Sequence, residues 1–197
     1  MSYVSIIVTF VLVNNLVLTH FLGLCPVIGS SRRVESAFGL GVAASFVMSV
    51  GSLITWALRS WLLMPLGIAF LQTFVFVLVL AALGHYLGVV IESVSPALHR
   101  SVGKYLPLIS VNCVVLGIAL VASRADYAAL ESLVAGLAAG IGFLLAAVVV
   151  ASIRERLERE WVPRVFRGTP IAFITTGLVA LAFLAFDQTF LGNLVGR

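Results

Sequence analysis

The sequence predicts an all-α integral membrane protein with six transmembrane helices. Of its 197 residues, 61% are hydrophobic and only 10% are charged, and the mean hydropathy is +1.17. A soluble domain has about 45–50% apolar and about 25% charged residues, so it could not bury this much apolar surface. Low charge and only two cysteines also exclude a disordered chain and a disulfide scaffold. The positive charges lie in short clusters between apolar runs, which indicates a lipid bilayer and no nucleic acid as the partner.

Six uncharged runs are the basis for the six helices. A transmembrane helix needs about 20 mostly apolar residues. Residues 1–31 contain no Asp, Glu, Lys or Arg, and no cleavage site follows, so we expect a first span and not a removable signal. The other uncharged runs are Ser36–Leu58, Ser60–Ile91, Tyr105–Ser123, Ser132–Ile153 and Gly168–Phe186. The loops between them are short, and no soluble domain is expected.

The distribution of positive charge predicts the orientation. Six spans place loops one, three and five on one side of the membrane, and the termini with loops two and four on the other. The second side holds three positive residues, Arg59, Arg124 and Arg197. The first side holds nine: Arg32, Arg33, Arg100, Lys104, Arg154, Arg156, Arg159, Arg164 and Arg167. Because positive loops stay in the cytoplasm, both termini are expected outside.

Two spans are predicted to be broken or short. The first run is interrupted by Asn14, Asn15, Gly23, Pro26 and Gly29. Proline removes a backbone donor and biases the preceding residue away from helical geometry, so we expect irregular backbone around Gly23-Leu24-Cys25-Pro26. Such backbone is tolerated inside a membrane only when it is packed in protein. The fourth span is short and contains Pro107, Asn112 and Gly117.

The two halves of the chain, residues 1–98 and 99–197, are predicted to be inverted repeats within a single membrane domain. Glu35-Ser36 opens the second span, and Glu131-Ser132 opens the fifth. Asn15 precedes Glu35 by 20 positions, and Asn112 precedes Glu131 by 19. Because each half has three spans, the halves must have opposite orientations. Small residues such as Gly136 and Gly140 also indicate close helix packing.

Ionisable side chains give little sign of chemistry. The spans have no Asp, Glu, Lys or Arg near their centres, whereas proton relays place carboxylates in mid-membrane. Glu92 and Asp187 lie near span ends and are expected to be interfacial. A haem between His20 and His85 is conceivable, but we favour hydrogen-bonded packing roles for both. No catalytic residue is predicted.

The two cysteines are more informative. Cys25 and Cys113 each lie in the first span of one half, in the helix expected to be broken or short. Composition alone favours a packing role, because free cysteines are often buried as small hydrophobic residues. If the broken helices meet at the midplane, however, two thiols converge there. Iron–sulfur clusters usually have four cysteine ligands, so this chain would supply half of a site and a partner the rest.

The sequence resembles the family of A subunits of the Rnf complex. The matching motifs are Val13-Asn14-Asn15 followed by Leu22-Gly23-Leu24-Cys25-Pro26, and Leu106-Pro107-Leu108-Ile109 followed by Asn112-Cys113-Val114-Val115-Leu116-Gly117. Ile153–Leu157, the Pro163 and Phe166-Arg167-Gly168 stretch, and Ile171–Gly177 continue the resemblance, which covers nearly the whole chain. The nearest confusable relative is the E subunit of the sodium-pumping NADH:quinone reductase.

The resemblance implies a function and a cofactor. Rnf complexes are bacterial inner-membrane oxidoreductases that pass electrons between ferredoxin and NAD, coupled to Na⁺ or H⁺ movement. Two homologous and oppositely oriented subunits, A and E, each supply two cysteines to one [2Fe–2S] cluster, and in this chain those are Cys25 and Cys113. The cluster would relay electrons between the B and G subunits, in a complex that also contains C and D. No active site is complete in this chain alone.

Two other functions stay open. A small inverted-repeat transporter would bind a solute at its broken helices, and a purely structural subunit would use the cysteines for packing. The Arg-rich stretch 154–167 either docks cytoplasmic subunits or anchors at anionic lipid headgroups, and we favour the lipid role.

Overall fold

Helices make up all of the regular structure that is described for this chain. The computed structural model describes residues 3–13, 15–30, 34–66, 69–94, 112–157, 163 and 168–184. The α-helices are α1 (Tyr3–Val8), α2 (Leu24–Ser30), α3 (Val34–Leu58), α4 (Met64–Leu66), α5 (Gln72–Val94), α8 (Cys113–Arg124), α9 (Ala129–Leu157) and α10 (Thr169–Leu184). Two π-helices, η1 (Thr9–Val13) and η2 (Arg59–Leu63), continue α1 and α3, and a 3₁₀ turn, η3 (Ala69–Leu71), precedes α5.

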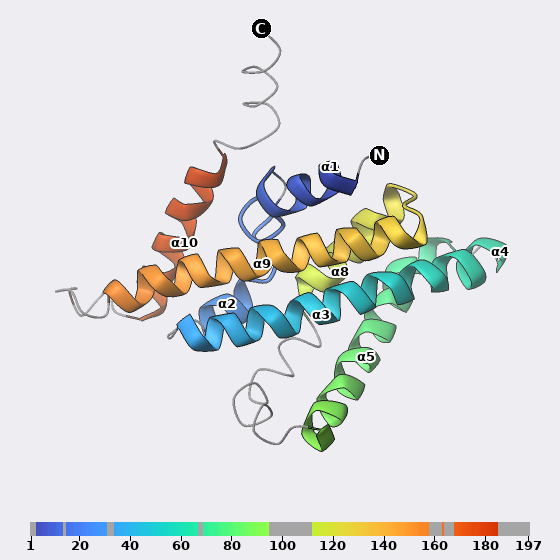
Figure 1. Cartoon of the computed structure of the whole chain (residues 1–197), viewed down its shortest axis with the longest axis horizontal. Helices are drawn as coiled ribbons and strands as arrows, with labels where there is room; N and C mark the ends of the chain where they lie inside the picture. The colour runs from blue at the N-terminus through green and yellow to red at the C-terminus, as the bar shows by residue number, and fades with distance from the viewer. Residues whose placement is uncertain are drawn as a thin grey trace, which may run out of the picture.

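The centre of the molecule is the pair α3 and α9, which lie side by side and run antiparallel (Figure 1). With η2 added to α3, these are the two described helices that are long and apolar enough to cross a membrane, Val34–Leu63 and Ala129–Leu157. Shorter apolar helices occupy Gln72–Tyr86, Cys113–Arg124 and Thr169–Phe183. The all-α membrane fold predicted from composition is therefore confirmed.

Small residues allow α3 and α9 to approach closely. A Cβ atom added to Gly140 would lie 2.5 Å from the Cα of Ser45, and one added to Gly41 would lie 2.9 Å from the Cβ of Leu144. Along the pair, residues 41, 45, 49 and 52 of α3 lie opposite 144, 140, 136 and 132 of α9. Residue numbers rise along α3 and fall along α9, so the two helices pack antiparallel along this seam. An inverted repeat requires this arrangement. The predicted packing role of Gly136 and Gly140 is confirmed.

The first uncharged run is broken, although the break lies before the expected position. After η1, residues 15–23 form irregular turns, and α2 begins at Leu24. The expectation of irregular backbone at Cys25 and Pro26 is therefore wrong, because both residues are helical. Pro26 is the third residue of α2. In the first turn of a helix a backbone N–H has no intrahelical partner, so proline costs little there.

Two side-chain contacts join helix ends that are far apart in the sequence. A guanidinium nitrogen of Arg59, at the end of α3, lies 2.6 Å from a carboxylate oxygen of Asp126 in the turn between α8 and α9. At the opposite end, Arg154 of α9 donates to the carbonyl of Ile28 in α2 at 2.8 Å. These contacts join the end of α3 to the turn between α8 and α9, and the end of α9 to α2. The six-span prediction expects the same pairs of loops to meet.

Arg154 differs from its expected role. It belongs to the stretch 154–167, for which the sequence favours anchoring at lipid headgroups, but it is buried and holds the C-terminal part of α2. The lipid interpretation of this stretch is thus wrong for Arg154, because its guanidinium satisfies a backbone carbonyl at a helix end. Residues 158–162 and 164–167 of the stretch lie outside the described residues.

Candidate functional site

Asn15 organises the irregular segment that follows η1. Its buried side-chain carbonyl accepts from the backbone N–H of Val17 at 3.1 Å, and its amide donates to the carbonyl of Gly142 in α9 at 2.9 Å. The backbone carbonyl of Asn15 accepts from the N–H groups of Leu18 and Thr19. These bonds satisfy backbone groups that the broken helix leaves free, which an apolar environment requires. Asn15 therefore holds the irregular segment against α9.

Asn112 has the matching role in the second half. It is the N-cap of α8, with extended backbone, and its side-chain oxygen accepts from the N–H of Val114 at 3.1 Å. The side-chain oxygens of Asn15 and Asn112 thus both accept from the backbone N–H two positions later, at 3.1 Å in each case. An Asn side chain at this position satisfies one of the unpaired donors of the first helical turn. Cys113, the next residue, is the first residue of α8.

The two asparagine-stabilised segments meet at Gly23 and Cys113. The backbone N–H of Gly23 donates to the Sγ of Cys113 at 2.9 Å, across 90 positions of sequence. Gly23 has a φ of +78°, in the left-handed region that favours glycine. A side chain at this position would overlap Val114 and would lie 3.1 Å from the Oδ1 of Asn112. Both the backbone angle and the lack of space therefore require glycine.

This contact brings the two cysteines into one region. Cys25 is two residues after Gly23, and two residues span at most about 7.6 Å between Cα atoms. Both cysteines are exposed and neither forms a disulfide. Burial as small hydrophobic side chains is therefore excluded within this chain. Two free, exposed thiols in one region of the chain are what a metal site shared with a second chain needs.

One donor next to Cys113 has no partner. The Nδ2 of Asn112 is buried and has no hydrogen-bond acceptor among the described residues, although its Oδ1 caps α8. An unpaired buried donor costs about 1–3 kcal/mol.

The other candidate residues form no metal-binding group with the cysteines among the described residues. His20 lies in the irregular segment and His85 on α5, and both are exposed. The described residues hold no group of three or more His, Cys, Asp or Glu that could bind a metal ion. Glu92 lies in the last turn of α5, whereas Asp187 lies outside the described residues.

Sequence reasoning did not identify two supporting residues, Gly142 and Arg154. Gly142 accepts the amide of Asn15, and a Cβ there would lie 2.8 Å from the carbonyl of Phe10. Gly142 does not share the four-residue spacing of Gly136 and Gly140, because it follows Gly140 by only two positions. Arg154 gave no signal either, because a buried arginine and a loop arginine look alike in sequence.

Comparison with known proteins agrees with the motifs that surround Cys25 and Cys113. The model of a family described as "Rnf-Nqr subunit, membrane protein" matches residues 3–190. The chain belongs to the Rnf-Nqr family. This assignment covers both cysteine segments and the α3–α9 pair.

Within the Rnf-Nqr family, curated relatives match almost from end to end. One is the A subunit of the Na⁺-translocating ferredoxin:NAD⁺ oxidoreductase complex of Acetobacterium woodii, 45% identical over 192 residues, or 98% of this chain and 100% of the relative. Others are the A subunits of the ion-translocating oxidoreductase complexes of Edwardsiella ictaluri and Citrobacter koseri. Each of these is 46% identical over 186 residues, or 94% of this chain and 96% of the relative.

Proposed function

We propose that this protein is the A subunit of an ion-translocating ferredoxin:NAD⁺ oxidoreductase of the Rnf type. Its role is to carry electrons through the membrane by holding half of a [2Fe–2S] cluster. The proposal rests first on relatives that bear this name over nearly the whole chain. The observation that carries the cofactor assignment is the Gly23–Cys113 hydrogen bond, which brings the two cysteine segments together.

The residues of this region fit such a cluster. Cys25 and Cys113 are free, exposed thiols, and two thiols are half of the usual four ligands. A cluster of this kind supplies a one-electron carrier when bound. Cys113 is at the N-terminus of α8, where the positive end of the helix dipole stabilises negative sulfur.

The chain's own residues contribute positioning. Asn15 and Asn112 satisfy the interrupted backbone and hold the two segments rigid. The N–H of Gly23 directs a hydrogen bond at the Cys113 sulfur, and hydrogen bonds to sulfur ligands set the reduction potential of a cluster. Arg154 fixes α2, the helix that contains Cys25.

The proposed function also implies the partner subunits and the cellular location of this protein. The other two cysteines come from the homologous, oppositely oriented E subunit, and the complex also includes the B, C, D and G subunits. The chain lies in the bacterial inner membrane as a six-span protein with both termini in the periplasm. The asymmetry of nine positive residues against three supports this orientation.

Two other functions fit the observations less well. A solute transporter needs space at its broken helix, but Gly23 is so tightly packed that even a Cβ would lie 3.3 Å from Phe143 as well as overlapping Val114. The E subunit of a sodium-pumping NADH:quinone reductase is a member of the same wider family. The named relatives of the A type, at 45–46% identity, favour the Rnf assignment.

The test is the iron content and EPR spectrum of the purified complex. The complex with the natural sequence is compared with Cys25→Ser and Cys113→Ser, and with Ser152→Ala, an exposed hydroxyl on α9. Either cysteine variant should lose the dithionite-reduced signal of this cluster and about two irons per complex, the content of one [2Fe–2S] cluster. Ser152→Ala should keep both. Retention of the signal and the iron in both cysteine variants excludes the ligand assignment.

A further inference from the structure

The irregular segment between η1 and α2, residues 15–23, exposes one aromatic ring in the region of the cysteines. The three apolar side chains at 16–18 are at most 5% exposed, whereas the ring of Phe21 is 51% exposed. Phe21 precedes Gly23 by two positions, and two residues span at most about 7.6 Å between Cα atoms. Because Gly23 is hydrogen-bonded to Cys113, the exposed ring belongs to the same region as the exposed thiols.

The backbone of Phe21 has an unfavourable conformation. Its φ is +53°, in the left-handed region that is costly for every residue with a side chain and most of all for a bulky one. The next two N–H groups both point inward from this turn. Leu22 donates to the carbonyl of Leu16 at 3.1 Å, and Gly23 donates to the Cys113 sulfur. Glycine or asparagine would form such a turn at lower cost, so the phenylalanine indicates a role for the ring itself.

One side of the segment is packed within the chain. The side-chain amide of Asn15 donates to the carbonyl of Gly142 in α9. Leu22 fills the space beside Gly117 of α8, where an added Cβ would lie 2.6 Å from the Cδ2 of Leu22. The segment is therefore fixed against α8 and α9, and Phe21 lies on the side that these helices leave exposed.

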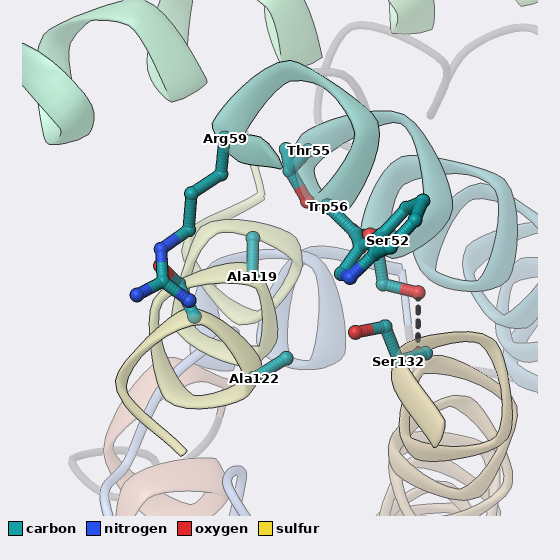
Figure 2. A pocket seen from close by; sticks show the side chains of 8 residues that line it. Ser52, Thr55, Trp56, Arg59, Ala119, Ala122 and Ser132 are labelled. Atoms are coloured by element: carbon teal, nitrogen blue, oxygen red, sulfur yellow. Dashed lines mark hydrogen bonds between the residues drawn. The ribbon is translucent and has the colours of Figure 1, made fainter. Parts of the chain in front are cut away.

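Helix α8 is a firm support for the segment. Ala119 and Ala122 are buried, and they line a small space that they share with Ser132 of α9 (Figure 2). The second half of α8 is thus held inside the molecule, and α8 also packs against α3. The start of α8, at Cys113, reaches the surface beside the segment.

The exposed side of the segment requires a cover of protein. Residues 15–23 lie in the middle of the uncharged run 1–31, which is the first predicted span. Irregular backbone at membrane depth does not face lipid, and it is tolerated only where protein packs on it or where it lines a water-filled cavity. A half-exposed phenylalanine ring does not suit a water-filled cavity. A second protein is therefore expected to cover Phe21.

We propose that the exposed side of this segment docks the oppositely oriented homologous subunit, with the ring of Phe21 as the anchor. The inference rests on the proposed function, in which that subunit supplies the other two cysteines and must lie against the same region. Aromatic side chains that fill apolar pockets are typical of the centres of protein interfaces. The ring of Phe21 also excludes water and lipid from the space beside the thiols.

A photocrosslink in the whole complex tests the contact. Phe21→p-benzoylphenylalanine places a photoreactive ring at this position, and the complex is irradiated in its native membrane. We expect a covalent product with the oppositely oriented homologous subunit, identified by mass spectrometry. A product with lipid alone, or with a different subunit, overturns the docking surface.

The matched control for the crosslink is Phe74→p-benzoylphenylalanine. The ring of Phe74 is 68% exposed on α5. It lies near the far end of α8, where Gln72 is hydrogen-bonded to Ser123, about 15 Å along that helix from Cys113. This variant should not give the product that position 21 gives. The same product from both positions contradicts an anchor at Phe21.

The affinity between the two subunits separates the ring from the turn. Each variant is reconstituted with the full-length partner subunit in lipid vesicles, and association is measured by energy transfer between dyes on the two N-termini. Phe21→Gly suits the backbone and removes the ring, so we expect roughly thirtyfold weaker association, the loss typical of an interface anchor. Phe21→Leu keeps an apolar side chain and should lose less, and Phe74→Ala should associate like the natural chain. Natural affinity in Phe21→Gly would show that Phe21 forms only a turn, and it overturns the anchor.

A second background separates this inference from the proposed cluster. In the Cys25→Ser and Cys113→Ser double variant, Phe21→Gly should weaken association by the same factor, because the ring contacts the partner and not the iron. Equal association with and without the ring in this background contradicts the anchor. Absence of iron and of the EPR signal from the natural pair contradicts the proposed cluster instead, and the crosslink and the affinities still decide the role of Phe21.

Discussion

The N–H of Gly23 and the Sγ of Cys113 are hydrogen-bonded at 2.9 Å, although 90 positions separate them in sequence. This bond joins the broken first helix to the start of α8 and places Cys25 and Cys113 in one region. It depends on a residue without a side chain, because the φ of Gly23 is +78° and its surroundings are filled.

Replacing Gly23 tests that bond directly. Gly23→Ala would force its methyl group into Val114 and move the N–H away from the sulfur. We expect a lower midpoint potential of the cluster, because a hydrogen bond to sulfur favours the reduced, more negative state, or loss of the cluster if the shift is large. Gly168→Ala is the control, since Gly168 has a φ of +96° but no atom within 4 Å of an added Cβ. Equal potentials in the natural complex and Gly23→Ala would contradict the assigned role.

The buried amide of Asn15 should be important for stability. Asn15→Leu leaves the N–H of Val17 and the carbonyl of Gly142 without their side-chain partner. We expect a loss of about 1–3 kcal/mol in the free energy of unfolding, measured by denaturation in detergent. Asn15→Asp should retain the acceptor for Val17 but lose the donor to Gly142, so its stability should be intermediate or lower. Natural stability in Asn15→Leu would show that the turn is held by other groups.

Replacing either of two glycines by alanine should change the stability in opposite directions, because only one of them lies in the α3–α9 seam. Gly140→Ala places a methyl group against the backbone of Ser45, and such overpacking costs about 1–3 kcal/mol. Gly177→Ala, in α10, meets nothing within 4 Å, so the higher helix propensity of alanine should stabilise by about 0.5–1 kcal/mol. Thermal unfolding of the two variants in detergent measures both. A smaller loss of stability in Gly140→Ala than in Gly177→Ala would contradict the close packing of α3 against α9.

Arg154 should control how firmly α2 is held. Arg154→Leu removes the donor to the carbonyl of Ile28 and leaves that carbonyl without this bond. We expect the cluster to be lost faster on dilution or chelator treatment, while the protein still inserts in the membrane. Arg156→Leu, two residues later and exposed, is the matched control. If both variants lose iron at the natural rate, Arg154 does not position Cys25.

Composition was sufficient to predict the membrane fold, and the pattern of small residues was sufficient to predict the close packing at Gly136 and Gly140, because these depend on local sequence. The first part of the predicted fourth span, residues 105–111, lies outside the described residues. The importance of Asn15 and Asn112 could also be predicted, since a broken helix in lipid needs polar side chains for its free backbone groups. The start of α2 could not be predicted, because Pro26 is compatible with either a break in a helix or the first turn of one. The bond between Gly23 and Cys113 could not be predicted either, as it depends on how two distant segments pack.

The most direct test of the central claim is the EPR spectrum of this chain purified together with its oppositely oriented partner, without the rest of the complex. We predict one [2Fe–2S] cluster per pair, about two irons, with a reduced-state signal that disappears in the Cys25→Ser and Cys113→Ser double variant. A pair that contains no iron, or an unchanged signal in the double variant, would contradict the claim that these two cysteines hold half of a shared cluster.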